Sequence, residues 1–354
     1  MQSDLVKPRV TLRDIARRLE VSHTTISRAL KNDLEISKEM RERVQAAARE
    51  MGYKPDPMLH ALAYYRREKR QVPIAAEMAW INHWPQPEKL RSFKEFNLYW
   101  QGAFAEAERC GFRLEEFVFE KGMTLARLEK ILRARNIRGI LLPPRRDLTP
   151  DYNDFDWGDF CIVRFGYSIS YPPAHLVSSD QLTDGLIAFE NIWKNGYRRI
   201  GLVTSHKMHT RFGAGFMFSQ LKWCPELRLP ALQLKQERRD EDKVLLKAWL
   251  KANRPDAILT DVSELRGLLQ DIGCKVPQDI GLAALSVLDG NADAGINQNS
   301  YEIGRAAVQL LISLINHNER GVPKICRELL VEGQWVNGST LPRKSEKKSS
   351  FEKQ

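Results

Sequence analysis

The 354-residue sequence has no apolar run close to the roughly 18 residues that a membrane-spanning helix needs. It has five cysteines, an odd number, and no two of them form a C-x-x-C pair. This spacing argues against a disulfide framework and against a structural zinc site. Residues 1–13 also lack the apolar stretch of a secretion signal. We therefore expect a protein of the reducing cytoplasm.

Signature motifs of common enzymes are missing as well. The sequence has no P-loop, no H-E-x-x-H and no G-x-S-x-G. Residues 213–215 begin like a dinucleotide-binding loop, but Phe218 stands where the third glycine belongs. His206 and His209 fit solvated loop residues better than a metal site, and the acidic stretch 151–159 lacks the spacing and glycine of an EF-hand. The sequence therefore predicts no catalytic residue, no cofactor and no metal.

Positive charge is in excess, and it lies at the two ends of the chain. The net charge is +10, of which residues 1–71 carry +6 and residues 339–354 carry +3. A basic module beside a nearly neutral body is typical of proteins that bind nucleic acid. A solvated basic surface would have the same composition, so charge alone does not decide between the two.

The N-terminal segment, 9–53, has the apolar spacing of three short helices. Within 12–19, apolar residues recur at i, i+3, i+4 and i+7, as on one face of a helix. Hydroxyl side chains stand where each helix would begin and can cap it: Thr11, Ser22 and Ser37. Gly52 is placed to end the third helix. The segment is therefore predicted to be a small all-α head.

From residue 74 onward, short apolar runs alternate with helical stretches. The predicted strands are 74–81, 112–119, 138–142, 160–165, 199–204, 256–260 and 281–285. The predicted helices are 95–109, 124–135, 181–195, 241–253, 263–272 and 301–316. This alternation predicts doubly wound parallel sheets with helices on both faces, and the length of the body favours two lobes.

Residues 11–30 have the pattern of a helix-turn-helix. Ala16 is small where two helices must cross closely, Val21 anchors the turn, and Ile26 docks the second helix. That second helix projects polar side chains outward: His23, Thr24, Ser27 and Arg28. An α-helix fits the major groove of DNA, where each base pair shows a distinct pattern of donors and acceptors.

This head resembles the LacI-type (lactose-repressor/galactose-repressor) family of bacterial transcription regulators. The matching residues are 10–16, 21–22, 25–28, 41–44, 47–48 and 52–56. The body is similar to the family at three helix-to-strand junctions: 195–201, 254–258 and 276–280. The resemblance implies a two-lobed body with the periplasmic-binding-protein-like fold.

The resemblance also implies a domain order. It consists of a helix-turn-helix DNA-binding head (1–54), a hinge helix and linker (55–73), a two-lobed effector-binding and dimerisation body (74–341) and a basic disordered tail (342–354). The implied function is a sequence-specific transcriptional repressor. A homodimer would bind a pseudo-palindromic operator under the control of a small molecule, a sugar or sugar derivative. An α/β enzyme and a solute-binding receptor, each carrying a DNA-binding head, are the alternatives.

Candidate DNA contacts come from the head and the hinge. They are Thr11, Ser22, His23, Thr24, Thr25, Ser27, Arg28, Asn32, Leu59 and Leu62. We expect base readout from His23, Thr24 and Arg28, since arginine is the commonest bidentate partner of guanine, although Arg28 could instead touch phosphate. The resemblance places the family's minor-groove leucine at Leu62, with Leu59 as the alternative.

Candidate effector contacts follow the predicted strands, because open α/β sheets bind ligands beyond the carboxyl ends of their strands. They are Asn82, Trp84, Arg145, Phe165, Tyr167, Asp180, Arg211 and Ser286. Aromatic rings beside amide, carboxylate and guanidinium groups suit a hydroxyl-rich ligand. Asp180 is the strongest single candidate, and it could equally cap the helix that follows it.

Three positions depart from the family pattern. Glu20 stands where the family usually has glycine, so a left-handed turn there would be strained. Ser286 replaces an aspartate that usually binds the effector. Phe212 occupies the position of an effector-binding arginine, with Arg211 one residue earlier. We therefore expect effector chemistry that differs from that of the family.

Overall fold

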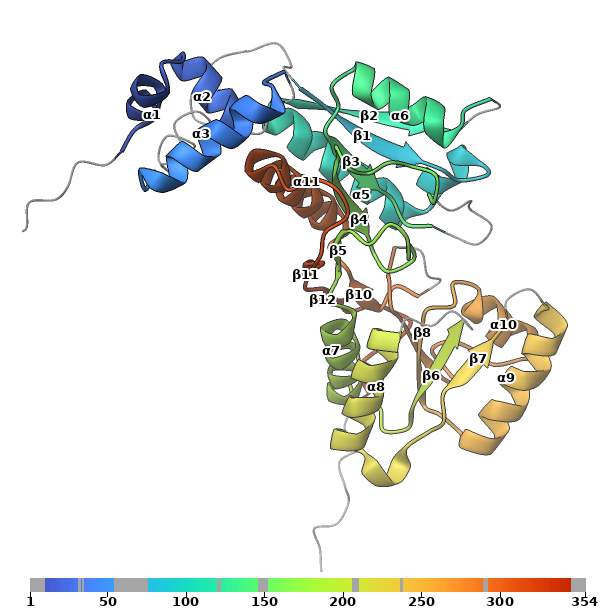
Figure 1. Ribbon diagram of the computed structural model, residues 1–354. Coiled ribbons are helices and arrows are strands. Elements are labelled where there is room, and N and C mark those ends of the chain that lie inside the picture. The colour runs from blue at the N-terminus through green and yellow to red at the C-terminus, as the bar shows by residue number, and fades with distance from the viewer. Residues whose placement is uncertain are drawn as a thin grey trace, which may run out of the picture.

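A small helical head and two α/β lobes make up the molecule (Figure 1). The computed structural model describes residues 10–30, 33, 35–53, 76–119, 122–145, 152–205, 210–235, 238–288 and 292–344. The proposed DNA contacts Asn32, Leu59 and Leu62, the linker 55–73 and the histidines at 206 and 209 lie outside the described residues.

The head consists of the three predicted helices, α1 (Leu12–Leu19), α2 (His23–Leu30) and α3 (Lys38–Glu50). The predicted caps at Ser22 and Ser37 are confirmed, because their Oγ atoms accept hydrogen bonds from the backbone N–H groups of Thr25 and Met40. At Thr11, the backbone N–H and the hydroxyl both donate to the Asp14 carboxylate. Six buried side chains from all three helices form its core: Ile15, Ile26, Ala29, Val44, Ala47 and Ala48.

The first lobe, here called the N-lobe, is a parallel sheet in the order β11-β5-β4-β3-β1-β2. Its strands are β1 (Ala76–Asn82), β2 (Phe112–Val118), β3 (Gly139–Leu142), β4 (Cys161–Phe165), β5 (His175–Ser179) and β11 (Glu328–Val331). Helices α5 (Lys94–Arg109) and α11 (Ser300–His317) pack on one face, and α6 (Leu125–Ala134) packs on the other. A short 3-10 helix, Pro87–Ser92, precedes α5.

The second lobe, here called the C-lobe, has the sheet order β12-β10-β9-β8-β6-β7. Its strands are β6 (Ile200–Ser205), β7 (Leu232–Leu234), β8 (Ala257–Thr260), β9 (Gly281–Ala284), β10 (Gly295–Asn297) and β12 (Gln334–Val336), of which only β12 is antiparallel to its neighbour. Helices α7 (Gln181–Lys194) and α8 (Thr210–Trp223) cover one face, and α9 (Arg239–Asn253) and α10 (Leu265–Asp271) cover the other (Figure 1).

All seven predicted body strands and all six predicted body helices are present, with ends shifted by one or two residues. The helix α8 was missed, because its glycines resemble a loop. They serve close packing instead: a Cβ on Gly215 would lie 2.2 Å from the backbone oxygen of Leu182 in α7. Five strands were not predicted from the sequence: β5, β7, β10, β11 and β12. Three of these, β7, β10 and β12, have only three residues each.

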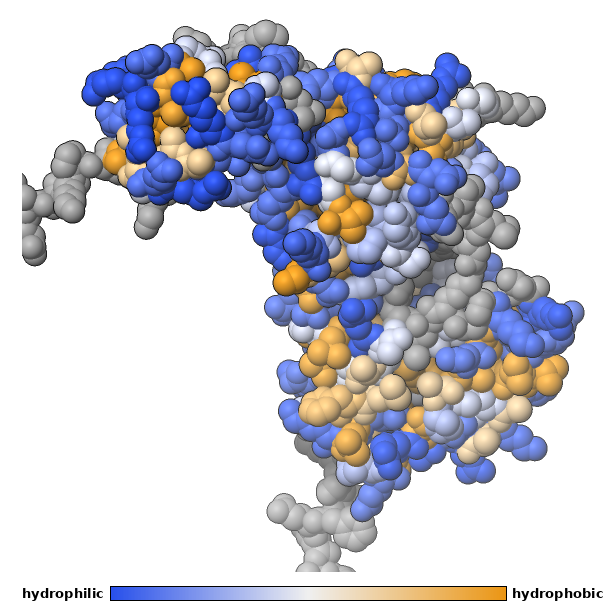
Figure 2. All heavy atoms as spheres, viewed as in Figure 1, coloured by the Kyte–Doolittle hydropathy of each residue, from blue (hydrophilic) through white to orange (hydrophobic). Residues whose placement is uncertain are grey.

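Apolar side chains gather on the outer surface of the C-lobe, over α7 and α8 (Figure 2). Five exposed large hydrophobic residues of these helices contribute: Leu182, Met217, Phe218, Leu221 and Trp223. Contiguous exposed apolar surface of this kind is typical of a protein–protein contact.

Three chain crossovers join the two lobes, and hydrogen bonds hold them together. The chain passes between the lobes after β5, after β10 and after β11. The backbone N–H of Asp180 donates to the Val331 oxygen at 2.8 Å, and the amide of Asn299 donates to the Glu332 oxygen at 2.8 Å. The first two crossovers are therefore fastened to the third, which is the short connection between β11 and β12.

Asp184 supplies a further bond at this junction, from a fully buried carboxylate. One oxygen accepts the backbone N–H of Gly333 at 2.9 Å, while the other has no hydrogen-bond partner. Burial raises the pKa of the Asp184 carboxyl to about 7, the Gly333 N–H opposes this rise, and the negative charges of Asp180, Glu332 and Glu95 add to it.

The raised pKa of Asp184 predicts that stability falls as pH rises. The carboxyl binds a proton more tightly in the folded protein than in the unfolded chain, so its ionisation weakens the fold between about pH 4 and pH 8. Asp184→Asn keeps an oxygen for Gly333 and cannot ionise. We expect it to be more stable than wild type by roughly 2–4 kcal/mol at pH 8, since one pKa unit corresponds to about 1.4 kcal/mol.

Denaturant unfolding of both proteins between pH 5 and pH 8 measures this difference. Glu190→Gln is the matched control, because it removes a solvent-accessible carboxylate from the same helix. If the Asp184→Asn protein loses stability with pH as steeply as wild type does, the buried carboxyl is not the cause.

Candidate DNA-binding surface and effector site

Helix α2 has one face in the core of the head and one face in solvent. Ile26 and Ala29 are buried against α1 and α3. Ser22, His23 and Thr24 are exposed at the start of the helix. Thr25, Ser27 and Arg28 are half-buried on its flanks, and Thr11 is exposed at the start of α1. The described DNA-contact candidates therefore lie at the surface, with six of the seven at or on the helix predicted to enter a groove.

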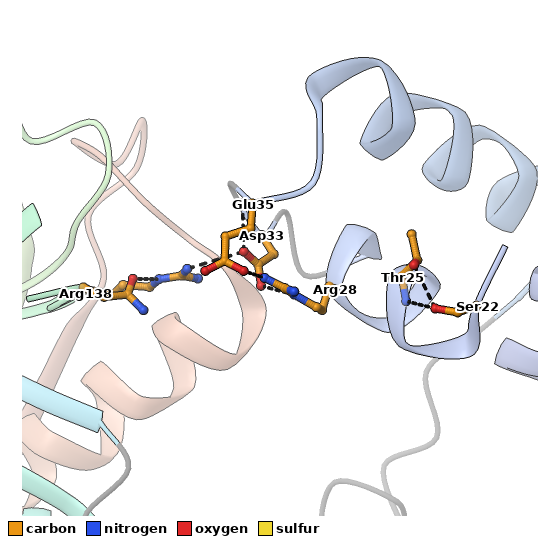
Figure 3. Close-up of polar contacts among 7 residues, drawn as sticks. Ser22, Thr25, Arg28, Asp33, Glu35 and Arg138 are labelled. Carbon is orange, nitrogen blue, oxygen red and sulfur yellow. Dashed lines mark hydrogen bonds and ion pairs between the residues drawn. The ribbon is translucent and has the colours of Figure 1, made fainter. Parts of the chain in front are cut away.

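The turn between α1 and α2 has the expected left-handed residue. Glu20 adopts φ 56° and ψ 37°, where the family pattern has glycine. A residue with a Cβ rarely adopts this conformation, so the predicted departure is a strained position in the structure. On the other side of the turn, the hydroxyls of Ser22 and Thr25 lie 2.8 Å apart and order the first turn of α2 (Figure 3).

Arg28 lies at the end of α2 among acidic side chains. Its Nε donates to Asp33 at 2.9 Å, and its Nη2 forms an ion pair with Glu35 (Figure 3). The other oxygen of Asp33 lies 3.9 Å from the Arg138 guanidinium, just before β3 of the N-lobe. The bond with Asp33 raises the pKa of Arg28, and the Arg28 guanidinium holds the pKa of Asp33 below its usual range. Asp33 thus places the head and the body in electrostatic contact.

Several effector candidates in the N-lobe have partners inside the lobe. The Asn82 amide donates to the Pro87 oxygen at 3.0 Å and to Glu116 at 2.9 Å. The indole N–H of Trp84 donates to the Pro144 oxygen at 2.9 Å. Both residues are nearly fully buried. They shape the end of β1, and little of their surface is open to a ligand.

Phe165 is buried in the core of the N-lobe. Its side chain has no exposed surface, and its ring packs against Trp80 and stacks on Tyr99, with centroids 5.2 and 5.3 Å away. The structure thus gives Phe165 packing partners in the core, and contact with an effector stays a prediction for this residue. It follows a strand end, as expected, but its side chain points into the core between the sheet and α5.

Arg211 and Tyr167 meet each other across the two lobes. The guanidinium carbon of Arg211, in α8, lies 3.6 Å from the centre of the Tyr167 ring in the N-lobe. Arg211 also pairs with Glu328 of β11 at 3.6 Å, and the Tyr167 hydroxyl donates to the same carboxylate at 3.0 Å. Burial and this hydrogen bond raise the pKa of Tyr167 to about 12. These three residues bridge the lobes beside the crossovers.

Asp180 caps α7, as the alternative interpretation predicted. One carboxylate oxygen accepts the Thr183 backbone N–H at 3.2 Å, and the other accepts the Thr183 hydroxyl at 2.7 Å. Ser286, beyond β9, accepts the backbone N–H of Leu288 at 3.3 Å. The backbone N–H of Arg145, beyond β3, donates to the Ser168 hydroxyl at 2.8 Å. Binding of an effector by these residues stays a prediction.

A polar pair that is not among the candidates predicted from the sequence lies at the carboxyl ends of β6 and β8. Ser205 donates to Asp261 through its backbone N–H at 2.8 Å and through its hydroxyl at 2.9 Å. Asp261 follows the apolar run of β8 directly, so the strand-end rule that selected Asn82 and Ser286 could have selected it too. Gln298, just past β10, is a second buried polar residue at this edge.

Within the described part of the chain, no group of three or more His, Cys, Asp or Glu side chains could hold a metal ion. No helix in the same residues is long and apolar enough to cross a membrane.

Family models match the two parts of the molecule that the structure separates. The model for bacterial regulatory proteins of the lacI family matches residues 11–56, which include the three head helices. The model for the periplasmic binding protein-like domain matches residues 189–340, which include most of the C-lobe. The chain belongs to the LacI family. It is accordingly a DNA-binding transcriptional regulator with a periplasmic-binding-protein-like body, and the predicted fold class is confirmed.

Curated relatives of this LacI-family chain are regulators as well. It is 25% identical over 353 residues to the HTH-type transcriptional repressor CytR of Escherichia coli K12, covering 91% of this chain and 95% of that protein. It is 46% identical over 55 residues to the HTH-type transcriptional regulator GntR of Pseudomonas aeruginosa, covering 16% of each. The sequence identity is thus higher over this segment, which is about as long as the head, than over the length shared with CytR.

Solved structures share the fold at low sequence identity. The complex of the transcriptional regulator CelR with cellobiose has a TM-score of 0.55 at 18% identity, covering 94% of this chain and all of that one. The lac repressor dimer, bound to operator and the anti-inducer ONPF, has a TM-score of 0.53 at 16% identity, covering 95% and 100%. At this level of sequence identity, the two structural similarities establish the fold of the LacI-family chain, but not its ligand or its operator.

Proposed function

We propose that this protein is a transcriptional repressor that binds an operator through α2 and is controlled by a small molecule bound between its lobes. The observation that carries the proposal is the two-sided character of α2, with an apolar face in the head core and polar side chains in solvent. Similarity to the repressor CytR over nine-tenths of the chain supports repression rather than activation of transcription. A DNA partner implies a cytoplasmic protein.

The proposed DNA surface consists of residues on and around α2. It comprises Thr11, Ser22, His23, Thr24, Thr25, Ser27 and Arg28, with Asn32, Leu59 and Leu62 proposed from the sequence alone. Phosphate contacts by hydroxyl and backbone groups would fix the register, and the longer side chains would read base edges. A two-fold homodimer would present two such helices to a pseudo-palindromic operator. The exposed apolar surface over α7 and α8 supports self-association.

The proposed effector is a carbohydrate or a sugar derivative, bound at the carboxyl ends of both sheets. Tyr167 and Arg211 come from opposite lobes, so a ligand held between them would affect how the lobes meet. Arg145, Asp180 and Ser286 would supply further polar contacts. The relatives are named as regulators, and we propose no enzymatic activity.

Replacing Arg28 tests base readout. Arg28→Ala should lower the ratio of operator affinity to random-DNA affinity by roughly 10-fold or more, because a bidentate arginine–guanine pair contributes about 1–3 kcal/mol of discrimination. Competition titrations at fixed salt measure this ratio. Arg18→Ala is the matched control: Arg18 also lies in the head and pairs with an acidic side chain, Glu50, but it is outside α2. Equal losses on both DNAs would assign Arg28 to phosphate.

Replacing Asp180 separates helix capping from ligand binding. Asp180→Ser should keep the cap, since serine is a good N-cap residue, and should remove the carboxylate. We expect unchanged unfolding and at least a tenfold loss of affinity for the effector, identified by calorimetric titration of the full chain with neutral and acidic sugars. Effector affinity equal to that of wild type would mean that Asp180 only caps α7.

A further inference from the structure

Two acidic residues of the head share the guanidinium of Arg28, and they differ in exposure. Asp33 binds Nε at 2.9 Å, and its side chain is only 22% exposed. Glu35 pairs with Nη2, and its side chain is 77% exposed. Both follow α2 closely in the chain. One partner is therefore part of the packed head, and the other reaches into solvent.

The backbone after α2 fixes the carboxylate of Asp33. Its own N–H donates to the Arg28 oxygen at 3.0 Å, and its carbonyl oxygen accepts the N–H of Ile36 at 3.0 Å. Its Oδ1 accepts the N–H of Glu35 at 3.1 Å, which leaves Oδ2 for Arg28. The bond from Arg28 keeps the pKa of Asp33 low, so the carboxylate stays ionised at neutral pH.

When an arginine reads a guanine, two N–H donors of its guanidinium must lie in the plane of the base. Arginine has five N–H groups in a rigid fork, and guanine accepts two of them at O6 and N7. A free arginine loses considerable rotamer entropy when it is ordered in the groove. A carboxylate that already holds Nε reduces this cost and leaves the two terminal nitrogens for the base.

We propose that Asp33 is a positioning residue, which holds Arg28 in the orientation that reads a guanine, and that Glu35 is a displaceable partner. The proposal rests on the proposed function, in which Arg28 contacts a base. The exposed pair with Glu35 is weak, because solvent screens it and both side chains are long. The DNA base replaces Glu35 at Nη2, while Asp33 stays in place at Nε.

Asp33 has a second cation, which supplies the competing explanation. Arg138 of the N-lobe lies 3.9 Å from Oδ1, while its own Nε donates to Asn136 at 3.2 Å. If Asp33 served mainly to dock the head on the body, removal of Arg138 would have the same consequence as removal of the Asp33 charge. The shorter bond, 2.9 Å to Arg28, favours the positioning role.

The test compares Asp33→Asn with Glu35→Gln, since each removes one negative charge beside Arg28. Asp33→Asn keeps Oδ1 for the Glu35 N–H, but its amide nitrogen cannot accept the bond from Arg28. Glu35→Gln weakens only the displaceable pair. The affinity of each variant for an operator and for random DNA is measured at one salt concentration. Glu50→Gln is the control variant, because it removes a negative charge elsewhere on the head.

We expect Asp33→Asn to lower the operator-to-random ratio about tenfold, with the loss confined to the guanine under Arg28 when operator positions are varied singly. Glu35→Gln and Glu50→Gln should raise affinity for both DNAs and leave the ratio unchanged. In the Arg28→Ala background, Asp33→Asn should cause no further loss of the ratio.

Other outcomes overturn specific claims. A ratio unchanged by Asp33→Asn, in a protein where Arg28→Ala lowers it, would refute the positioning role alone. A loss of the ratio in Arg138→Ala as large as that in Asp33→Asn would assign Asp33 to head–body docking instead. A ratio unchanged by Arg28→Ala would refute base readout itself, and with it the proposed role of Arg28.

Discussion

The hydrogen bonds that fasten two of the lobe crossovers to the third, the short connection between β11 and β12, are the constraint on which the body depends. Asp180, Asp184 and Asn299 each bind the segment 331–333. Because all crossovers leave the sheets at their carboxyl ends, the same bonds place the strand ends of both lobes at one junction. A ligand there would act on the geometry of these bonds and on the bridge from Arg211 to Tyr167.

The head has a much smaller apolar core than either lobe. Six buried side chains form its core, and the polar face of α2 is free of that core. Asp33 and Arg138 form an ion-pair contact between head and body among the described residues. The apolar core of the head is separate from the cores of the two lobes in the same residues. Surface contacts of this kind, together with the linker, are therefore candidates for communication between effector site and DNA.

Local sequence rules predicted the features that depend on local sequence. The caps at Ser22 and Ser37, the apolar periodicity of the head helices and the left-handed turn at Glu20 are found where they were expected. The segment of α8 was misjudged because its glycines serve contact with α7, which lies distant in sequence. The orientation of Phe165 could not be predicted for a related reason: the strand-end rule locates a residue, but packing against α5 decides where its side chain points.

Polar contacts between distant segments could not be predicted at all. Tyr167 and Glu328 are 161 positions apart, and nothing in either segment indicates the other. The buried state of Asp184 depends on Gly333, where a Cβ would lie 2.3 Å from the carboxylate. Even the short-range pair of Arg28 and Asp33 depends on the path of the loop after α2, which residue spacing does not specify.

Paired α2 helices that read a defined DNA sequence should select that sequence from a random pool. Selection of bound fragments from random DNA by the full chain is the measurement that checks this. We expect a short motif that occurs twice, in inverted orientation, with half-site centres about one helical turn or a multiple of it apart. Enrichment of unrelated sequences, with affinity governed by salt and fragment length alone, would contradict it.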